Sequence, residues 1–231
     1  MSSHPRSAAG RRARLPASDA REQLLDAAIE LFAARGIANT TVAQIAERGR
    51  VTSAMVHYWF DTRERLLEAV VQERIAAQFH AIWDPVDVDH GAPLELVRGI
   101  VGRMFDVTEK MPWLPSLWLR EIVNEGGLLR EQALRHIPVK RVAAFGQSIA
   151  RGQSRGEVNS EIEPLLLFNS ILALVMLPQA TAKIWRRINP TLTLERAALE
   201  RHVTGLLMQG ITGRSAAGSA RRRHGKARAT A

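Results

Sequence analysis

The stretch TVAQIAERGRVTSAMVHYWF, residues 41–60, decides the fold of the N-terminal part of this chain. Its first half spaces apolar side chains as a helix does, and the Thr41 hydroxyl can cap that helix, with a glutamine three residues further on as in a capping box. Gly49 can end the helix, and the hydroxyl of Thr52 can cap a second one. The sequence therefore predicts two short helices joined by a tight turn.

The second predicted helix has two different faces. Its inward positions are Val56 and Phe60. Its outward positions are Ser53, Ala54, Met55, His57 and Tyr58. The small side chain of Ala46 lets the two helices cross closely, so that the outward residues form a compact ridge. A DNA major groove, about 12 Å wide, admits such a ridge. An ordinary corner of an all-α core is the alternative for the bare pair of helices.

Further helices are predicted on both sides of this pair. Upstream, Asp19 and Glu22 are expected to form a capping box, and Gly36 is expected to end the helix that they open. The apolar face of that helix consists of Leu24, Leu25, Ala28, Leu31 and Phe32. Downstream, Asp61 and Glu64 are expected to open a long helix. The unit thus comprises three helices and the start of a fourth.

This unit, residues 19–78, resembles the DNA-binding domain of the TetR family of bacterial transcriptional regulators. The matching positions are Thr41, Val42, Ile45, Ala46, Val51, Thr52, Val56, Phe60, Thr62, Arg63, Glu64 and Leu66. Two positions depart from the family pattern: Arg50 replaces the turn glycine, and His57 replaces a tyrosine, with Tyr58 beside it. A non-glycine residue with positive φ costs about 1 kcal/mol, so the turn is expected to be shifted or slightly strained.

The resemblance implies which side chains face DNA. Phosphate contacts fall to Thr41, Thr52, His57 or Tyr58, and Arg63. Base contacts fall to Ser53, Ala54 and Met55. Because the recognition helix itself has no arginine or asparagine, base reading is expected to rest on Thr52, Ser53, Tyr58 and water, or on Arg50 reaching in from the turn. Hydroxyl groups and helix N-termini donate to phosphate oxygens, whereas Ala54 and Met55 offer only apolar contact, for instance to thymine methyl groups.

Positive charge is concentrated at the two ends of the chain. The formal net charge is +9, yet residues 1–18 hold four arginines and residues 213–231 five arginines and a lysine, with no acid in either. Removing those ten charges leaves −1 for residues 19–212. Both ends are predicted to be disordered tails, because they cannot bury apolar surface. The first could lie along phosphates or in the minor groove; a solubilising role is the alternative.

Composition limits the other classes of protein. The chain has no cysteine, which excludes disulfides and thiolate metal sites and allows a reducing cytoplasm, the expected location. The first residues do not have the pattern of a signal peptide, so none is expected. The longest apolar run, residues 165–178, is short and is interrupted by Asn169 and Ser170, so it is predicted to be a buried helix that does not enter a membrane.

Residues 79–212 are predicted to form a larger, all-helical domain. Helices are expected at 93–109, 116–124, 128–151, 164–188 with a kink at Pro178, and 194–212. The last two have apolar faces made of Leu165, Phe168, Leu172, Val175 and Met176, and of Leu199, Val203, Leu206 and Leu207. A four-helix bundle with a second copy, as in the resembled family, is favoured over burial within one subunit, because half-sites about 34 Å apart need two recognition helices.

The resembled family has a small-molecule pocket in this domain. Candidate ligand-binding residues are Met104, Trp113, Trp118, Arg120, Phe145 and Trp185, with Glu121 or Asn124 as further polar contacts. Large aromatic and methionine side chains suit an apolar ligand. Plain core packing is the alternative for each of them.

Two patterns suggest other chemistry but lack its context. Residues 152–156, GQSRG, have the spacing of a nucleophile elbow, which requires a strand-to-helix turn. His80, Asp84, Asp87, Asp89 and His90 are potential cation ligands, although Pro85 makes a solvated loop the better interpretation. The hypothesis is a homodimeric, ligand-responsive repressor of a palindromic operator, with no catalytic residues, metal or cofactor. The alternative is a small helical enzyme or ligand carrier.

Overall fold

The computed structural model describes residues 17–191 and 195–212, which contain helices and no strand. The helices are α1 (Ala17–Arg35), α2 (Val42–Arg48), α3 (Ser53–Phe60), α4 (Arg63–Val70), η1 (Val71–Ile75), α5 (Ala76–Trp83), α6 (Pro93–Lys110), α7 (Leu114–Leu117), η2 (Trp118–Val123), α8 (Arg130–Arg135), α9 (Val139–Ser154), α10 (Pro164–Ala180), α11 (Ala182–Ile188) and α12 (Arg196–Ile211). The segments η1 and η2 are π-helices. The all-α prediction is confirmed. The predicted basic tails lie outside the described residues, except for Ala17 and Ser18.

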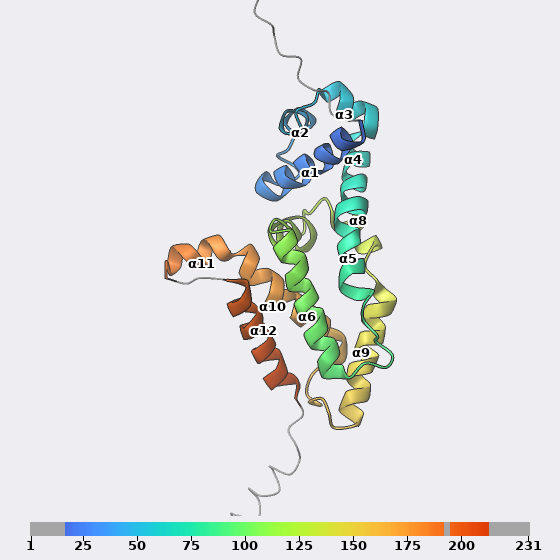
Figure 1. Cartoon of the computed structure of the whole chain (residues 1–231), viewed down its shortest axis with the longest axis vertical. Coiled ribbons are helices and arrows are strands. Elements are labelled where there is room, and N and C mark those ends of the chain that lie inside the picture. The colour runs from blue at the N-terminus through green and yellow to red at the C-terminus, as the bar shows by residue number, and fades with distance from the viewer. Residues whose placement is uncertain (1–16, 192–194, 213–231) are drawn as a thin grey trace, which may run out of the picture.

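The molecule has two hydrophobic cores at successive levels along its long axis (Figure 1). The first core includes Leu24, Phe32, Ile45, Val56, Phe60 and Leu66. The second includes Trp83, Ile100, Phe105, Phe145, Ile171 and Val203. The run α4, η1 and α5 continues from one core to the other, and Leu117 and Leu129 of the larger part complete the first core. The N-terminal unit is therefore packed against the larger part.

Two predicted helix starts are wrong. The helix α1 begins at Ala17, ahead of Asp19, so Asp19 lies within its first turn. The cap of α4 is Thr62, whose hydroxyl accepts a hydrogen bond from the Arg65 N–H at 3.2 Å. Asp61 instead ends α3 with a φ of +59°, and its N–H donates to the His57 carbonyl. Since Asp61 closes the preceding helix, the next residue becomes the cap.

Two predicted long helices are divided in the structure. The segment 128–151 forms α8 and α9 with a break before Pro138, because proline cannot donate the hydrogen bond that would continue a helix. The segment 164–188 bends by 58° between α10 and α11. The break lies at Thr181, and Pro178 lies inside α10; the Thr181 hydroxyl donates to the Leu177 carbonyl at 2.7 Å, and such back-bonding often bends helices.

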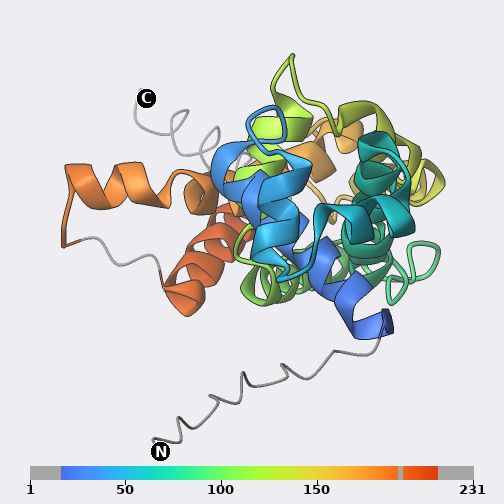
Figure 2. The same ribbon diagram turned by 90° about the horizontal axis from the view of Figure 1, so that it is seen from above.

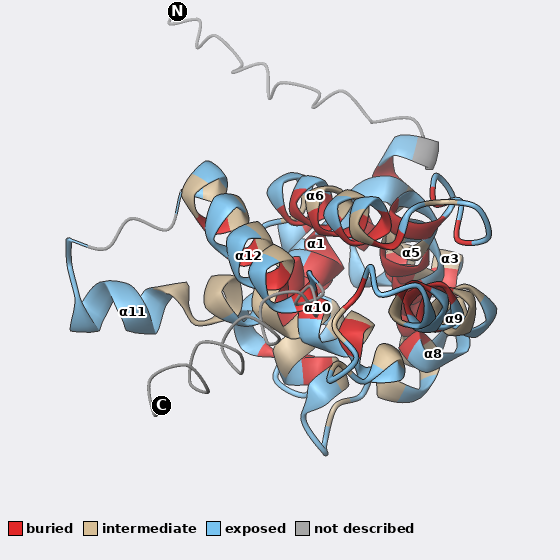
Figure 3. Ribbon diagram, turned by 90° about the horizontal axis from the view of Figure 1, so that it is seen from below, coloured by how far each residue is buried: buried red, intermediate tan, exposed pale blue. Residues whose placement is uncertain are grey.

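Most residues predicted to face a second copy are packed inside the subunit. Val175 and Met176 of α10 and Leu199, Val203 and Leu207 of α12 are buried, and Phe168 and Leu172 pack against the same core. Those predicted contacts are wrong, because α12 uses its apolar face to pack on α6 and α10. The apolar residues that remain exposed there are Leu165, Leu166, Leu177, Ile184, Trp185, Ile188 and Leu206. Helix α11 stands away from the body of the molecule (Figures 2 and 3).

In the described ranges, no single helix is long and apolar enough to span a membrane. The bent pair α10 and α11 meets the criterion only when the two helices are taken together, by length and composition.

Candidate DNA interface and ligand cavity

Both predicted helix caps of the helix-turn-helix are confirmed. The Thr41 hydroxyl accepts from the Gln44 N–H at 3.2 Å, and the Gln44 side chain accepts from the Thr41 N–H at 2.9 Å. The Thr52 hydroxyl accepts from the Met55 N–H at 3.3 Å. These bonds satisfy N–H groups that a helix start leaves unpaired, so α2 and α3 begin at positions set by local sequence.

The turn between α2 and α3 is strained and not shifted. Gly49 caps α2 with a φ of −78°, and Arg50 takes the left-handed conformation with a φ of +55°. Gly49 serves a different purpose, since a Cβ there would lie 2.9 Å from the Leu24 side chain on α1. The glycine thus permits close packing of the turn on α1, while an arginine occupies the left-handed position.

Replacing Arg50 by glycine should affect the stability of the fold and the binding of DNA in different ways. We expect Arg50→Gly to stabilise the fold by about 0.5 to 1 kcal/mol, because glycine adopts positive φ without the Cβ clash. The exposed guanidinium would be lost. If the guanidinium contacts a phosphate, its loss should make the DNA-binding constant less sensitive to salt. The slope of the logarithm of that constant against the logarithm of salt concentration should become less steep by about 0.9. Thermal melts and salt-dependent binding isotherms measure the two effects, and a lower Tm would contradict the strained-turn interpretation.

The two faces of α3 are arranged as the sequence pattern predicts. Val56 and Phe60 are buried, and Ser53, Ala54, His57 and Tyr58 are exposed, Tyr58 by 83%. Met55 is half-buried. His57 Nδ1 lies 3.1 Å from the Asp61 carbonyl oxygen, which holds the ring toward the end of its own helix. Tyr58 is therefore an aromatic side chain open to solvent on this surface, and its contact with DNA stays a prediction.

Arg63 holds the protein's own backbone. Its Nη2 donates to the Thr40 carbonyl at 3.0 Å and also to the Ile37 carbonyl. Both acceptors lie in the connection between α1 and α2. The guanidinium therefore links this connection to the start of α4, and the phosphate contact that the resemblance implies for Arg63 stays a prediction.

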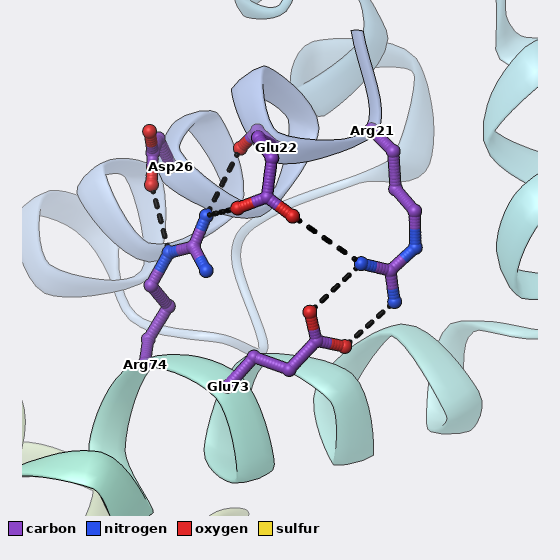
Figure 4. A network of polar contacts seen from close by, with 5 residues as sticks. All are labelled: Arg21, Glu22, Asp26, Glu73 and Arg74. Carbon is purple, nitrogen blue, oxygen red and sulfur yellow. Dashed lines mark hydrogen bonds and ion pairs between the residues drawn. The ribbon is translucent and has the colours of Figure 1, made fainter. Parts of the chain in front are cut away.

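A network of charged side chains joins α1 to η1 (Figure 4). Arg21 donates two hydrogen bonds to the Glu73 carboxylate, at 2.7 and 2.6 Å. Arg74 donates to Asp26 at 2.8 Å and to Glu22 at 2.6 Å. The pairing with Arg21 lowers the pKa of Glu73 below its ordinary value. The network is partly exposed, so its main effect is to align α1 with the long helical run.

This pairing predicts a pH dependence. Because the pKa of Glu73 is lowered in the folded chain, its ionised form stabilises the fold above the ordinary glutamate pKa, and this stabilisation is lost as the pH falls through the lowered value. The difference in Tm between the parent and Glu73→Gln should therefore be largest near neutral pH and should shrink below about pH 4. Glu68→Gln, at an exposed position on α4, is the control. A difference that grows on acidification would contradict the assignment.

A cavity of about 100 Å³ lies in the larger part of the molecule, between α5, α6, η2, α8 and α10. Its wall includes Ile75, Phe79, Trp83, Met104, Trp118, Ile122, Ala133, Phe168 and Met176. The amide and hydroxyl side chains in the wall are already bonded: Gln78 donates to the Arg74 carbonyl and Thr108 to the Phe105 carbonyl. The cavity therefore offers an almost wholly apolar surface.

The structure brings two of the six candidate ligand-binding residues to this cavity, Met104 and Trp118. The other four do not line it. Phe145 is buried behind Trp83, Trp113 packs between the two cores, Arg120 donates to the Ala33 carbonyl, and Trp185 is exposed on α11. Trp83 and Phe168 were not predicted to line the cavity. Their ring centroids lie 4.9 Å apart. The four-residue spacing of Phe168, Leu172 and Met176 was the available signal.

The two patterns that suggested other chemistry are parts of ordinary local structure. Ser154 is the last residue of α9, and its hydroxyl donates to the Arg151 carbonyl at 2.8 Å. His80 pairs with Asp84 at 3.4 Å, and His90 with Asp87 at 3.2 Å. In the described part of the chain, no group of three or more such side chains is placed to hold a metal ion.

A capped turn that presents one exposed helix from a three-helix base defines a helix-turn-helix DNA-binding protein. Residues 24–70 match the model of a family described as bacterial regulatory proteins, tetR family. The chain is 25% identical over 143 residues to the HTH-type transcriptional repressor NicS of Pseudomonas putida, covering 62% of this chain and 67% of NicS. It is 27% identical over 143 residues to the regulator BetI of Paraburkholderia phymatum, covering 58% and 71%. Residues 24–70 thus form a DNA-binding unit of the tetR type, and the chain is similar to transcriptional regulators that contain this unit.

Solved structures have the same fold. The ketosteroid transcriptional regulator KstR2 of Mycobacterium tuberculosis superposes with a TM-score of 0.64 at 19% identity, covering 84% of this chain and 95% of KstR2. The regulator FadR of Bacillus subtilis, in complex with stearoyl-CoA, has a TM-score of 0.61 at 19% identity, with coverage of 82% and 98%. The likeness extends beyond the helix-turn-helix to the larger helical part.

Proposed function

We propose that this protein is a homodimeric repressor that leaves a palindromic operator when a small, mainly apolar molecule occupies the cavity. The observation that carries the proposal is one continuous helical run. It begins at Arg63 under the helix-turn-helix and ends at Trp83 in the cavity wall, with Ile75 also in that wall. A change at the cavity can thus reach the separation of two recognition helices.

The proposed DNA contacts lie on one exposed surface of α2, α3 and their turn. The hydroxyls of Thr41, Thr52 and Tyr58 are suited to phosphates, as is the Arg50 guanidinium. Ser53, Ala54, Met55 and His57 form the remainder of the surface, and the first two are exposed at the start of α3, where recognition helices contact base edges.

The proposed interface between copies is the exposed apolar surface of α10, α11 and α12. It includes Leu165, Leu166, Leu177 and Leu206. Exposed apolar residues gathered on neighbouring helices are typical of interaction sites in soluble proteins, and a two-fold axis through this surface would place one recognition helix on each half-site. Such a dimer is proposed to act in the cytoplasm.

The proposed effector is apolar, because the cavity wall consists mainly of apolar side chains and its amide and hydroxyl groups, on Gln78 and Thr108, are hydrogen-bonded within the protein. Two structural neighbours support this class: one is named a ketosteroid regulator, and the other was solved with stearoyl-CoA. Cavities for ligands of that size are typically about 300 to 1,000 Å³, so the cavity must widen on binding.

A mobility-shift assay with DNA from upstream of the chain's own gene tests the proposal. We expect saturable binding to a short palindrome at nanomolar protein, weakened by salt. Tyr58→Ala should weaken this binding by about 1 to 3 kcal/mol. Arg98→Ala, at an exposed position on α6, is the control and should bind as the parent does. Equal affinity for palindrome and random duplex would favour a helical enzyme or carrier and would overturn the proposal.

A further inference from the structure

The π-helix η2 contacts two parts of the molecule. Trp118 and Ile122 line the cavity. Arg120 and Glu121 reach the N-terminal unit, where Arg120 donates to the Ala33 carbonyl at 3.3 Å and Glu121 Oε1 accepts from the Ile37 N–H at 3.0 Å. One short helix therefore forms part of the cavity wall and also holds the end of α1.

Glu121 is unusual in its surroundings, because its carboxyl group is buried, with the residue only 5% exposed. Its second oxygen accepts from the Leu128 N–H at 3.3 Å. A buried carboxylate is unfavourable unless hydrogen bonds replace its water, and here main-chain N–H groups do so. The approach is close: a Cβ on Gly36, whose φ is +84°, would lie 3.3 Å from Oε1. The contact thus depends on a defined position of the α1–α2 connection.

The same connection leads directly to the DNA-binding surface. The Ile37 N–H is bonded to Glu121, and the Ile37 carbonyl is bonded to Arg63, the first residue of α4. Arg63 also holds the carbonyl of Thr40, which precedes the cap of α2. Two charged side chains, one from each part of the molecule, therefore fix the segment from which α2 and then α3 begin.

We propose that Glu121 is a positioning residue of the helix-turn-helix, through which η2 transmits the state of the cavity to the α1–α2 connection. This route is separate from the helical run α4, η1 and α5, and it rests on the proposed function only for the identification of the cavity as the effector site. Glu121 lies between Trp118 and Ile122 in one π-helix, a geometry that differs from an α-helix in its hydrogen-bond register. An apolar molecule that displaces Trp118 would therefore displace the carboxylate and loosen Ile37.

Hydrogen exchange of the full-length protein, without DNA or effector, tests the positioning role. Glu121→Ala should raise the exchange rate of the Ile37 amide at least about tenfold relative to the Phe105 amide in the second core. Glu121→Gln should raise it less, because its amide oxygen can still accept from Ile37. Ile149→Ala, a buried truncation on α9, controls for loss of overall stability and should leave the ratio unchanged. An equal ratio in Glu121→Ala and Ile149→Ala would overturn the role.

A double-mutant cycle tests the route from the cavity. In the parent protein, Trp118→Ala should accelerate exchange of the Ile37 amide several-fold. In the Glu121→Ala variant the same change should accelerate it by less than about twofold, because both changes would act through one chain of contacts. Met104→Ala opens the same cavity from α6 and is the matched control, expected to leave Ile37 exchange within about twofold of the parent. Independent, multiplying effects of Trp118→Ala and Glu121→Ala would overturn the route. Because no DNA is present, this outcome does not depend on whether the repressor proposal holds.

Discussion

Phe60→Ala should lower the free energy of unfolding by about 3 to 5 kcal/mol, because it empties a ring-sized space beneath the recognition helix. Phe60 is 4% exposed at the end of α3, within the core formed with Leu24 and Val56. The Arg21 guanidinium lies over its ring, 5.2 Å from the centroid, and that contact would be lost as well. Urea unfolding followed by circular dichroism measures the change.

Tyr58→Ala is the matched control, since it removes an aromatic ring from the opposite face of the same helix. Tyr58 is exposed, so its removal should change the free energy of unfolding by less than about 0.5 kcal/mol while DNA affinity falls. If Tyr58→Ala unfolded at much lower urea and Phe60→Ala unfolded like the parent, the inner and outer faces of α3 would be inverted. Every proposed DNA contact on that helix would then be withdrawn.

Arg63→Ala should lower the free energy of unfolding by about 2 to 4 kcal/mol, because it removes charge-assisted hydrogen bonds to two main-chain carbonyls. The carbonyls of Ile37 and Thr40 would lose their link to α4. Thermal and urea unfolding of the full-length chain measure the effect. Exchange of amides in the α1–α2 connection should also accelerate.

Arg65→Ala is the control for the loss of a positive charge. Arg65 lies two residues further along α4 and is exposed, so its removal should change stability by less than about 0.5 kcal/mol. If Arg63→Ala were as stable as Arg65→Ala, and only the salt dependence of DNA binding changed, Arg63 would be a phosphate contact and not a structural residue.

The features that were predicted well depend on neighbours in sequence. The caps at Thr41 and Thr52 need only an N–H two or three residues away, and a 3.6-residue period places Val56 and Phe60 inward. Gly36 ends α1 with positive φ, as predicted, because glycine adopts that conformation without steric cost. Where two local signals competed, as at Asp61 and Thr62, the sequence did not distinguish them.

The features that were missed depend on residues far apart in sequence. The hydrogen bond from Arg63 to the Ile37 carbonyl depends on where Ile37 lies in space. Likewise, Phe145 and Trp118 are both large aromatic residues of the larger part, yet only Trp118 lines the cavity, because Phe145 packs behind Trp83. Composition cannot separate a side chain that fills a core from one that borders a cavity.

The sequence by itself determined the helical class, the helix-turn-helix and its outward face, because periodicity and capping act within a few residues. Only the tertiary structure decided the strain at Arg50, the wall of the cavity and the packing of α12 on α6. It also decided that buried Glu121 meets the N–H of Ile37, which lies 84 residues earlier in the chain. Such contacts arise when helices pack, and the free energy that selects one packing over another comes from the whole interface.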